Sequence, residues 1–135
     1  MTDMIAVPTS PGEVLDRITI LELKATRLEE PKKSSAQASL DALQELFDNF
    51  AAVAGLELTE GELMSVRDHT GSLRRINCAL WLVEDNLRRH EKNKNFDAAF
   101  VEDARSVYLL NDQRHSKKVA IDNLFKCKQV EVKGY

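Results

Sequence analysis

The chain has 135 residues, of which 43% are hydrophobic and 30% are charged, a composition typical of a globular protein with one domain spanning residues 1–135. Its net charge of −3 gives no general attraction to nucleic acids or acidic membrane surfaces, so neither is expected as a partner. No apolar run approaches the roughly 20 residues that span a bilayer, and the first residues lack the pattern of a signal peptide. Two cysteines without CxxC spacing indicate reduced thiols in a cytoplasmic protein.

The first two predicted helices form a short hairpin. Ser10-Pro11-Gly12-Glu13 is a strong helix start, because Ser10 can accept a backbone hydrogen bond and Pro11 sits where its missing N–H costs nothing. This helix is expected to run to about Glu30, where Pro31 stops it, and its apolar stripe comprises Val14, Leu15, Ile18, Leu21, Ala25 and Leu28. The second helix is expected from about Ser35 to Ala54, with a buried face of Leu40, Leu43, Phe47, Phe50 and Ala54.

Two longer helices are predicted next. Thr59-Glu60-Gly61-Glu62 is a capping-box pattern that opens a helix ending near Lys92, with a bend or break expected at Gly71. Asn95 is expected to cap a fourth helix that runs to about Lys126. Residues 129–133 alternate as a short strand would, and residues 4–7 are their plausible partner, within one chain or between two.

These elements predict an all-α fold: a four-helix, two-hairpin bundle with long third and fourth helices and short extended termini. At 1.5 Å per residue the first hairpin is about 30 Å long and the second about 45–50 Å. Because the shorter hairpin cannot cover the longer one, a homodimer is expected.

Eight consecutive polar residues, 111–118, interrupt the apolar pattern of the fourth helix. A helix packed in a small bundle should carry an apolar stripe along its whole length. The interruption therefore indicates either a helix that leaves the core or inward side chains that meet polar partners, and the second option would be a site.

A tight turn near Lys94 and Asn95 would align three pairs of side chains across the second hairpin. These pairs, the predicted polar seam, are Glu84 with Arg105, Trp81 with Tyr108, and Asn77 with Asp112. They are expected either to fix the register of the hairpin or to line a pocket together with the belt beyond them. The candidates for that pocket are the belt residues Arg114, His115 and Lys118, together with Arg17, Thr19 and Glu22 of the first helix.

The familiar catalytic patterns are missing from the sequence. There is no HExxH, no Glu-x-x-His pair, no Gly-rich phosphate loop and no cysteine set as an activated nucleophile, so no catalytic residue, metal or cofactor is expected. One enzymatic option is left open, in which arginine and lysine side chains hold an anionic substrate as in small all-α chorismate mutases. The match of residues 15–27 to the first helix of those enzymes lacks their paired aspartates.

Four segments carry a family resemblance: SPGEVLDRITILELK (residues 10–24), INCALWLVED (76–85), ARSVYLLNDQR (104–114) and EVKGY (131–135). They resemble a family of small bacterial proteins known as a domain of unknown function. The resemblance implies a role beside sugar-transfer enzymes of surface-polysaccharide synthesis, as a partner and not as the catalyst. It implies no reaction and no catalytic residues.

Two hypotheses follow. The first is a non-catalytic helical module that dimerises and binds a protein partner or a small ligand through the seam and belt. The second is a small-molecule enzyme that holds an anionic substrate with arginine and lysine side chains.

Overall fold

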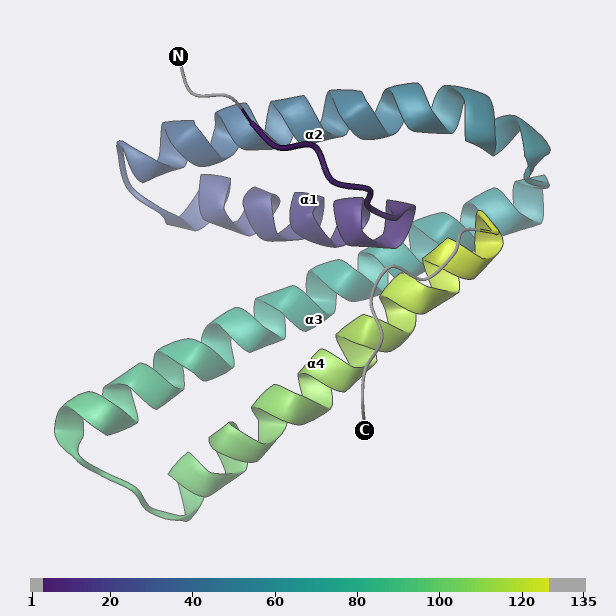
Figure 1. The fold of residues 1–135 in the computed structure, drawn as a ribbon. Coiled ribbons are helices and arrows are strands. Elements are labelled where there is room, and N and C mark those ends of the chain that lie inside the picture. Colours follow the sequence, from purple (N-terminus) through teal and green to yellow (C-terminus); the bar gives the residue numbers. More distant parts are fainter. Residues whose placement is uncertain (1–3, 127–135) are drawn as a thin grey trace.

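The structure, a computed structural model, describes residues 4–126 and confirms the all-α, four-helix architecture with two hairpins. Its elements are α1 (Pro11–Arg27), α2 (Lys32–Ala54), a short 3₁₀ turn η1 (Gly55–Glu57), α3 (Glu60–Asn93) and α4 (Ala98–Leu124). The α1–α2 hairpin lies across one end of the longer α3–α4 hairpin, whose other end projects away from it (Figure 1).

Local capping fixes where the helices begin. Ser10 Oγ accepts from the Glu13 amide at 3.2 Å, with Pro11 as the first helical residue, as predicted. Thr59 and Glu62 form the predicted capping box, with two reciprocal hydrogen bonds of 3.0 and 3.1 Å. Hydrogen bonds from the backbone N–H and the hydroxyl of Thr59 lower the pKa of Glu62.

Several predicted boundaries shift by two or three residues. α1 ends at Arg27 instead of Glu30, α2 begins at Lys32 instead of Ser35, and α4 ends at Leu124. The cap of α4 is Asp97, not Asn95, because Asp97 Oδ1 accepts from the Phe100 amide at 3.1 Å. The expected bend at Gly71 is wrong: α3 continues through it, since a single glycine costs only about 1 kcal/mol in a helix interior.

The hydrophobic core lies where α1 crosses α3 and α4. Its fully or nearly fully buried side chains are Ile18, Leu73 and Ile121, each at most 2% exposed. Around them lie Val14, Leu15 and Val66, and α2 adds the partly buried Leu40, Leu43 and Phe47. The face predicted to be buried on α2 is therefore only partly covered, and the one buried residue of α2, Ala36, lies outside that prediction.

Beyond this crossing the α3–α4 hairpin stands apart from α1 (Figure 1). α3 has 34 residues and α1 has 17, which correspond to about 51 and 26 Å. Residues 4–10 form neither helix nor strand. The strand predicted over 129–133 lies outside the described residues, and the homodimer stays a prediction.

Candidate functional site

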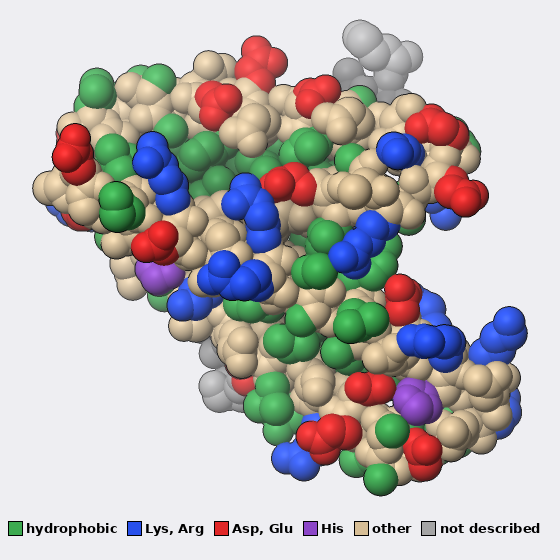
Figure 2. Space-filling view, turned by 180° about the vertical axis from the view of Figure 1, so that it is seen from behind, with side chains coloured by type: hydrophobic (Ala, Val, Ile, Leu, Met, Phe, Trp, Pro, Cys, Tyr) green, Lys and Arg blue, Asp and Glu red, His purple; other side chains and the backbone are tan. Residues whose placement is uncertain are grey.

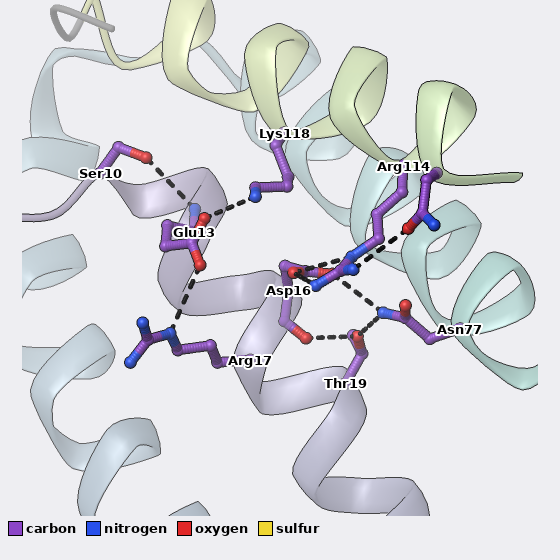
Figure 3. A network of polar contacts seen from close by, with 9 residues as sticks. Ser10, Glu13, Asp16, Arg17, Thr19, Asn77, Arg114 and Lys118 are labelled. Carbon is purple, nitrogen blue, oxygen red and sulfur yellow. Dashed lines mark hydrogen bonds and ion pairs between the residues drawn. The ribbon is translucent and has the colours of Figure 1, made fainter. Parts of the chain in front are cut away.

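A carboxylate is buried at the centre of the crossing. Asp16 of α1 is fully buried, and it is paired with Arg114 of α4 by a two-pronged ion pair (Figure 3). Nε of Arg114 lies 2.9 Å from Oδ1 of Asp16, and Nη2 lies 2.5 Å from Oδ2. Such a fork fixes both the distance and the orientation of the two planar groups. It therefore ties α1 to α4.

The third helix joins the same carboxylate through Asn77. The Asn77 amide nitrogen donates to Asp16 Oδ1 at 2.9 Å and to Thr19 Oγ1 at 2.8 Å. The Thr19 hydroxyl donates in turn to the Asp16 backbone carbonyl at 2.7 Å (Figure 3). We call Asp16, Thr19, Asn77 and Arg114 the polar latch. Among the described residues no buried side-chain polar atom lacks a hydrogen-bond partner, so the latch is fully satisfied.

A second contact brings the start of α1 against α4. The Gly12 amide donates to Asp122 Oδ1 at 2.7 Å, and both residues are buried. A Cβ on Gly12 would lie 2.4 Å from the backbone carbonyl oxygen of Lys118, so only glycine permits this approach. Lys118 Nζ then reaches Glu13 Oε2 at 2.5 Å. The helix start recognised in the sequence is thus also a point of close approach between α1 and α4.

The side-chain pairs predicted for the polar seam do not form. Asn77 donates to Asp16 and Thr19 instead of Asp112, and Glu84 lies 3.9 Å from Arg88 instead of pairing with Arg105. No ion pair within residues 4–126 joins Glu84 to Arg105.

Trp81 is also placed differently from the prediction. Its ring lies under the guanidinium of Arg27, at 5.6 Å, and Tyr108 is 53% exposed. Arg105 and Asp112 are exposed as well. The predicted trio on α4 therefore faces away from α3.

The predicted pairs fail because the register of the α3–α4 hairpin differs from the predicted one. Nε2 of His90 lies 3.3 Å from Oδ2 of Asp103. Residues of α3 and α4 that are equally far in sequence from the midpoint between 96 and 97 therefore lie at the same height along the hairpin. The prediction had placed this centre two residues earlier, at Lys94 and Asn95. Moving the centre by two residues moves the level partner of each α3 residue by four positions along α4, about 6 Å, so the predicted pairs no longer lie at the same height.

An open cleft lies beside the polar latch, between the two hairpins, where Figure 2 shows a deep notch with hydrophobic side chains along its walls. Its volume is about 350 Å³. It is lined from α1 by Ile20, Leu23, Lys24 and Leu28, from α3 by Asn77, Leu80, Trp81, Glu84 and Arg88, and from α4 by Asn111 and Arg114. The cleft thus gathers four of the predicted site residues, together with Lys24, Arg88 and Asn111.

Two further predicted cations, Arg17 and Lys118, lie in another pocket, of about 630 Å³, beside residues 4–10. Both of them converge on Glu13: Arg17 Nε lies 3.4 Å from one carboxylate oxygen and Lys118 Nζ lies 2.5 Å from the other (Figure 3). Their charges are partly neutralised there, which weakens this larger pocket as an anion site. Glu22 pairs with Arg74 at 3.2 Å and lines neither pocket.

Sequence reasoning missed Asp16 and Asp122, the two buried carboxylates. Each stands beside core residues: Asp16 between Leu15 and Ile18, and Asp122 next to Ile121. An acidic residue inside an apolar stripe is the signal that would have marked both, because a carboxylate is buried only where it is paired or hydrogen-bonded.

Two kinds of site are missing from the described part of the chain. No three His, Cys, Asp or Glu side chains cluster as metal ligands within it. None of its helices combines the length and apolar character needed to cross a bilayer. Comparisons with protein-family models, with curated proteins and with solved structures find no match to this chain.

Proposed function

We propose that this protein is a non-catalytic binding module and that the cleft between its hairpins takes a small anionic ligand with a ring or sugar body. The observation that carries this proposal is that Lys24, Arg88 and Arg114, one cation from each of three helices, line the same cleft as Trp81. Cations and an aromatic wall in one concave site are the elements that bind an anionic group and the less polar body attached to it.

The three cations differ in how much of their charge a ligand would meet. Lys24 makes no ion pair with any residue in the described range. Arg88 lies at 3.2 Å from Asp85 and 3.9 Å from Glu84, but its side chain is 72% exposed and can turn towards a ligand. Arg114 is fixed by Asp16 and remains 28% exposed. Lys24 and Arg88 would therefore supply most of the attraction.

Binding without reaction is favoured by the state of the polar latch, which meets the cleft through Asn77 and Arg114. Asp16, Thr19 and Asn77 are bonded to one another and to Arg114, and all three are at most 5% exposed. Groups held in this way maintain the shape of the site, and neither Asp16 nor Thr19 lines the cleft where a substrate would bind.

The enzymatic alternative would use the same cations. A rearrangement of an anionic substrate needs only electrostatic positioning, which the three cations would provide. The two functions differ in outcome, since the enzyme would convert a bound anion and the binding module would return it unchanged.

Sugar phosphates are the first ligands to test, because they combine an anion with a body that stacks on an indole. They also suit the setting that the family resemblance implies, beside sugar-transfer enzymes.

Trp81 is the only tryptophan of the chain, so its fluorescence reports on the cleft. We expect sugar phosphates to change this fluorescence saturably and to be recovered intact. Lys24→Gln and Arg88→Gln should each weaken binding about tenfold, since a charge-assisted hydrogen bond is worth about 1.5–3 kcal/mol. Arg89→Gln is the matched control, because this neighbouring exposed arginine bonds Asn86 and does not line the cleft.

Three results would contradict the proposal. The first is unchanged fluorescence with sugar phosphates and inorganic phosphate up to about 10 mM, because such a cleft would hold no anion of physiological relevance. The second is an equal loss of affinity in the Arg89 control, which would assign binding to overall charge. The third is conversion of the bound compound, which would favour the enzyme.

A further inference from the structure

The α3–α4 hairpin buries very little of its length. Not one residue between 81 and 120 is buried, although 36 of these 40 positions lie within α3 or α4. In α4 only Ile121 and Asp122 are buried. A helix of a small bundle normally buries an apolar stripe. The exposed apolar surface of α4 therefore indicates a site where another molecule binds.

One face of α4 has the character of a contact surface. Val101, Arg105, Tyr108 and Asp112 follow one another at steps of four, three and four residues, which places them along one side of the helix. Val101 and Tyr108 are 51% and 53% exposed, and Leu109 beside them is 47% exposed. The opposite side of α4 faces α3, where Leu110, Gln113 and Lys117 share a groove with Ile76 and Ala79.

This face is self-complementary in charge. Arg105 and Asp112 stand at equal distances on either side of the point between Tyr108 and Leu109. A two-fold axis through that point would place Arg105 of each copy against the partner's Asp112, and the Tyr108 and Leu109 side chains of both copies together at the centre. A carboxylate accepts several donors, so Asp112 can take this one in addition to its contacts within the chain.

We propose that a second copy of this chain packs antiparallel along the α4 face formed by Val101, Arg105, Tyr108, Leu109 and Asp112. The contact is isologous and closes at two copies. With 27 residues α4 is about 40 Å long and about 10 Å wide, so the buried area falls in the small class, below about 1,200 Å² in total. The dimer is accordingly reversible at micromolar concentration and weakens as salt is added.

The test is the mass of the full chain in solution from about 1 to 500 μM, measured by light scattering and sedimentation. The mass should rise from 15.3 kDa towards twice that value. Arg105→Glu and Asp112→Lys should each raise the dimer Kd at least tenfold, because each change places like charges at two symmetric positions. The double variant Arg105→Glu/Asp112→Lys restores opposite charges and should bring the Kd back to within about threefold. Arg89→Glu, at an exposed position of α3, is the control and should not change it.

Each outcome decides the matter. A monomer mass throughout this range overturns the proposal, and so does a dimer that is insensitive to Arg105→Glu and to Tyr108→Ala. Failure of the charge-swapped double variant to recover overturns the antiparallel register. Circular dichroism checks that every variant keeps its helices. We expect that it does, because the substituted positions are exposed. The cleft proposal is tested separately, because the Trp81 titration is performed on dilute protein below the dimer Kd.

Discussion

The two ends of the α3–α4 hairpin differ sharply although the same two helices run through both. At the crossing with α1, Leu73 and Ile121 are fully excluded from solvent and the polar latch joins three helices. In the arm, which we define as residues 81–111, no residue is buried. We infer from this difference that the interactions at the crossing contribute most of the free energy of unfolding, whereas the arm presents an exposed surface for binding.

Local interactions hold the arm in shape. Arg88 pairs with Glu84 and Asp85 one turn earlier, and Lys94 pairs with Glu91. Such pairs contribute about 0.2–0.5 kcal/mol each. At the tip Phe100 packs edge-on against Phe96 and His90, with ring centroids 5.1 and 5.7 Å apart. These contacts are too few to stabilise a free hairpin, so the arm depends on the crossing or on a partner.

The largest effect should come from breaking the polar latch. Asp16→Ala leaves the Arg114 guanidinium without its buried carboxylate and removes an acceptor from Asn77. We expect a loss of about 3 kcal/mol in the free energy of unfolding and a melting temperature lower by about 10 °C. Chemical denaturation and calorimetry measure both quantities.

Glu84→Ala is the control for the latch in the arm, and it should cost less than about 0.5 kcal/mol because its ion pair with Arg88 is exposed. Replacing both partners, as in Asp16→Leu/Arg114→Met, should be less damaging than Asp16→Ala, since no charge is then stranded. Equal effects at Asp16 and Glu84 would remove the distinction between crossing and arm.

A smaller change in the free energy of unfolding, of opposite sign, is expected from alanine substitutions at two glycines. Gly12→Ala would place its Cβ 2.4 Å from the Lys118 carbonyl oxygen, so we expect destabilisation by about 2 kcal/mol. Gly71→Ala should instead stabilise by about 0.5–1 kcal/mol, because its Cβ meets only Arg75 Nη1, at 3.7 Å, and alanine favours the helix. Urea denaturation of the two variants gives the sign directly. Destabilisation of similar size at both positions would show that the close approach at Gly12 is unimportant.

The sequence was sufficient for the parts of the fold that depend on neighbouring residues. The four helices, the Ser10 cap and the Thr59–Glu62 capping box were predicted, because caps and helical periodicity are local. The cap of α4 was assigned to Asn95 instead of Asp97 because both residue types cap helices well and stand two positions apart.

The candidate site was predicted in part. Asn77, Trp81, Glu84 and Arg114 do line one cleft, but the partners assigned to them were wrong. Asp16 and Arg114 are 98 positions apart in the chain, and no local pattern links them. Which residues of α3 and α4 lie level depends on a turn of a few residues, and a two-residue error in its centre moves every predicted partner by four positions along α4.

Hydrogen exchange of backbone amides, followed by mass spectrometry at about 1 and 200 μM protein, tests most directly whether crossing and arm differ in this way. At both concentrations residues 14–19 and 66–77 should exchange slowly. Residues 84–109 should exchange fast in dilute protein and gain protection at the higher concentration, most strongly over 101–109, where the second copy is proposed to pack. Equal protection of arm and crossing in dilute protein, or an arm whose exchange ignores concentration, would contradict the account.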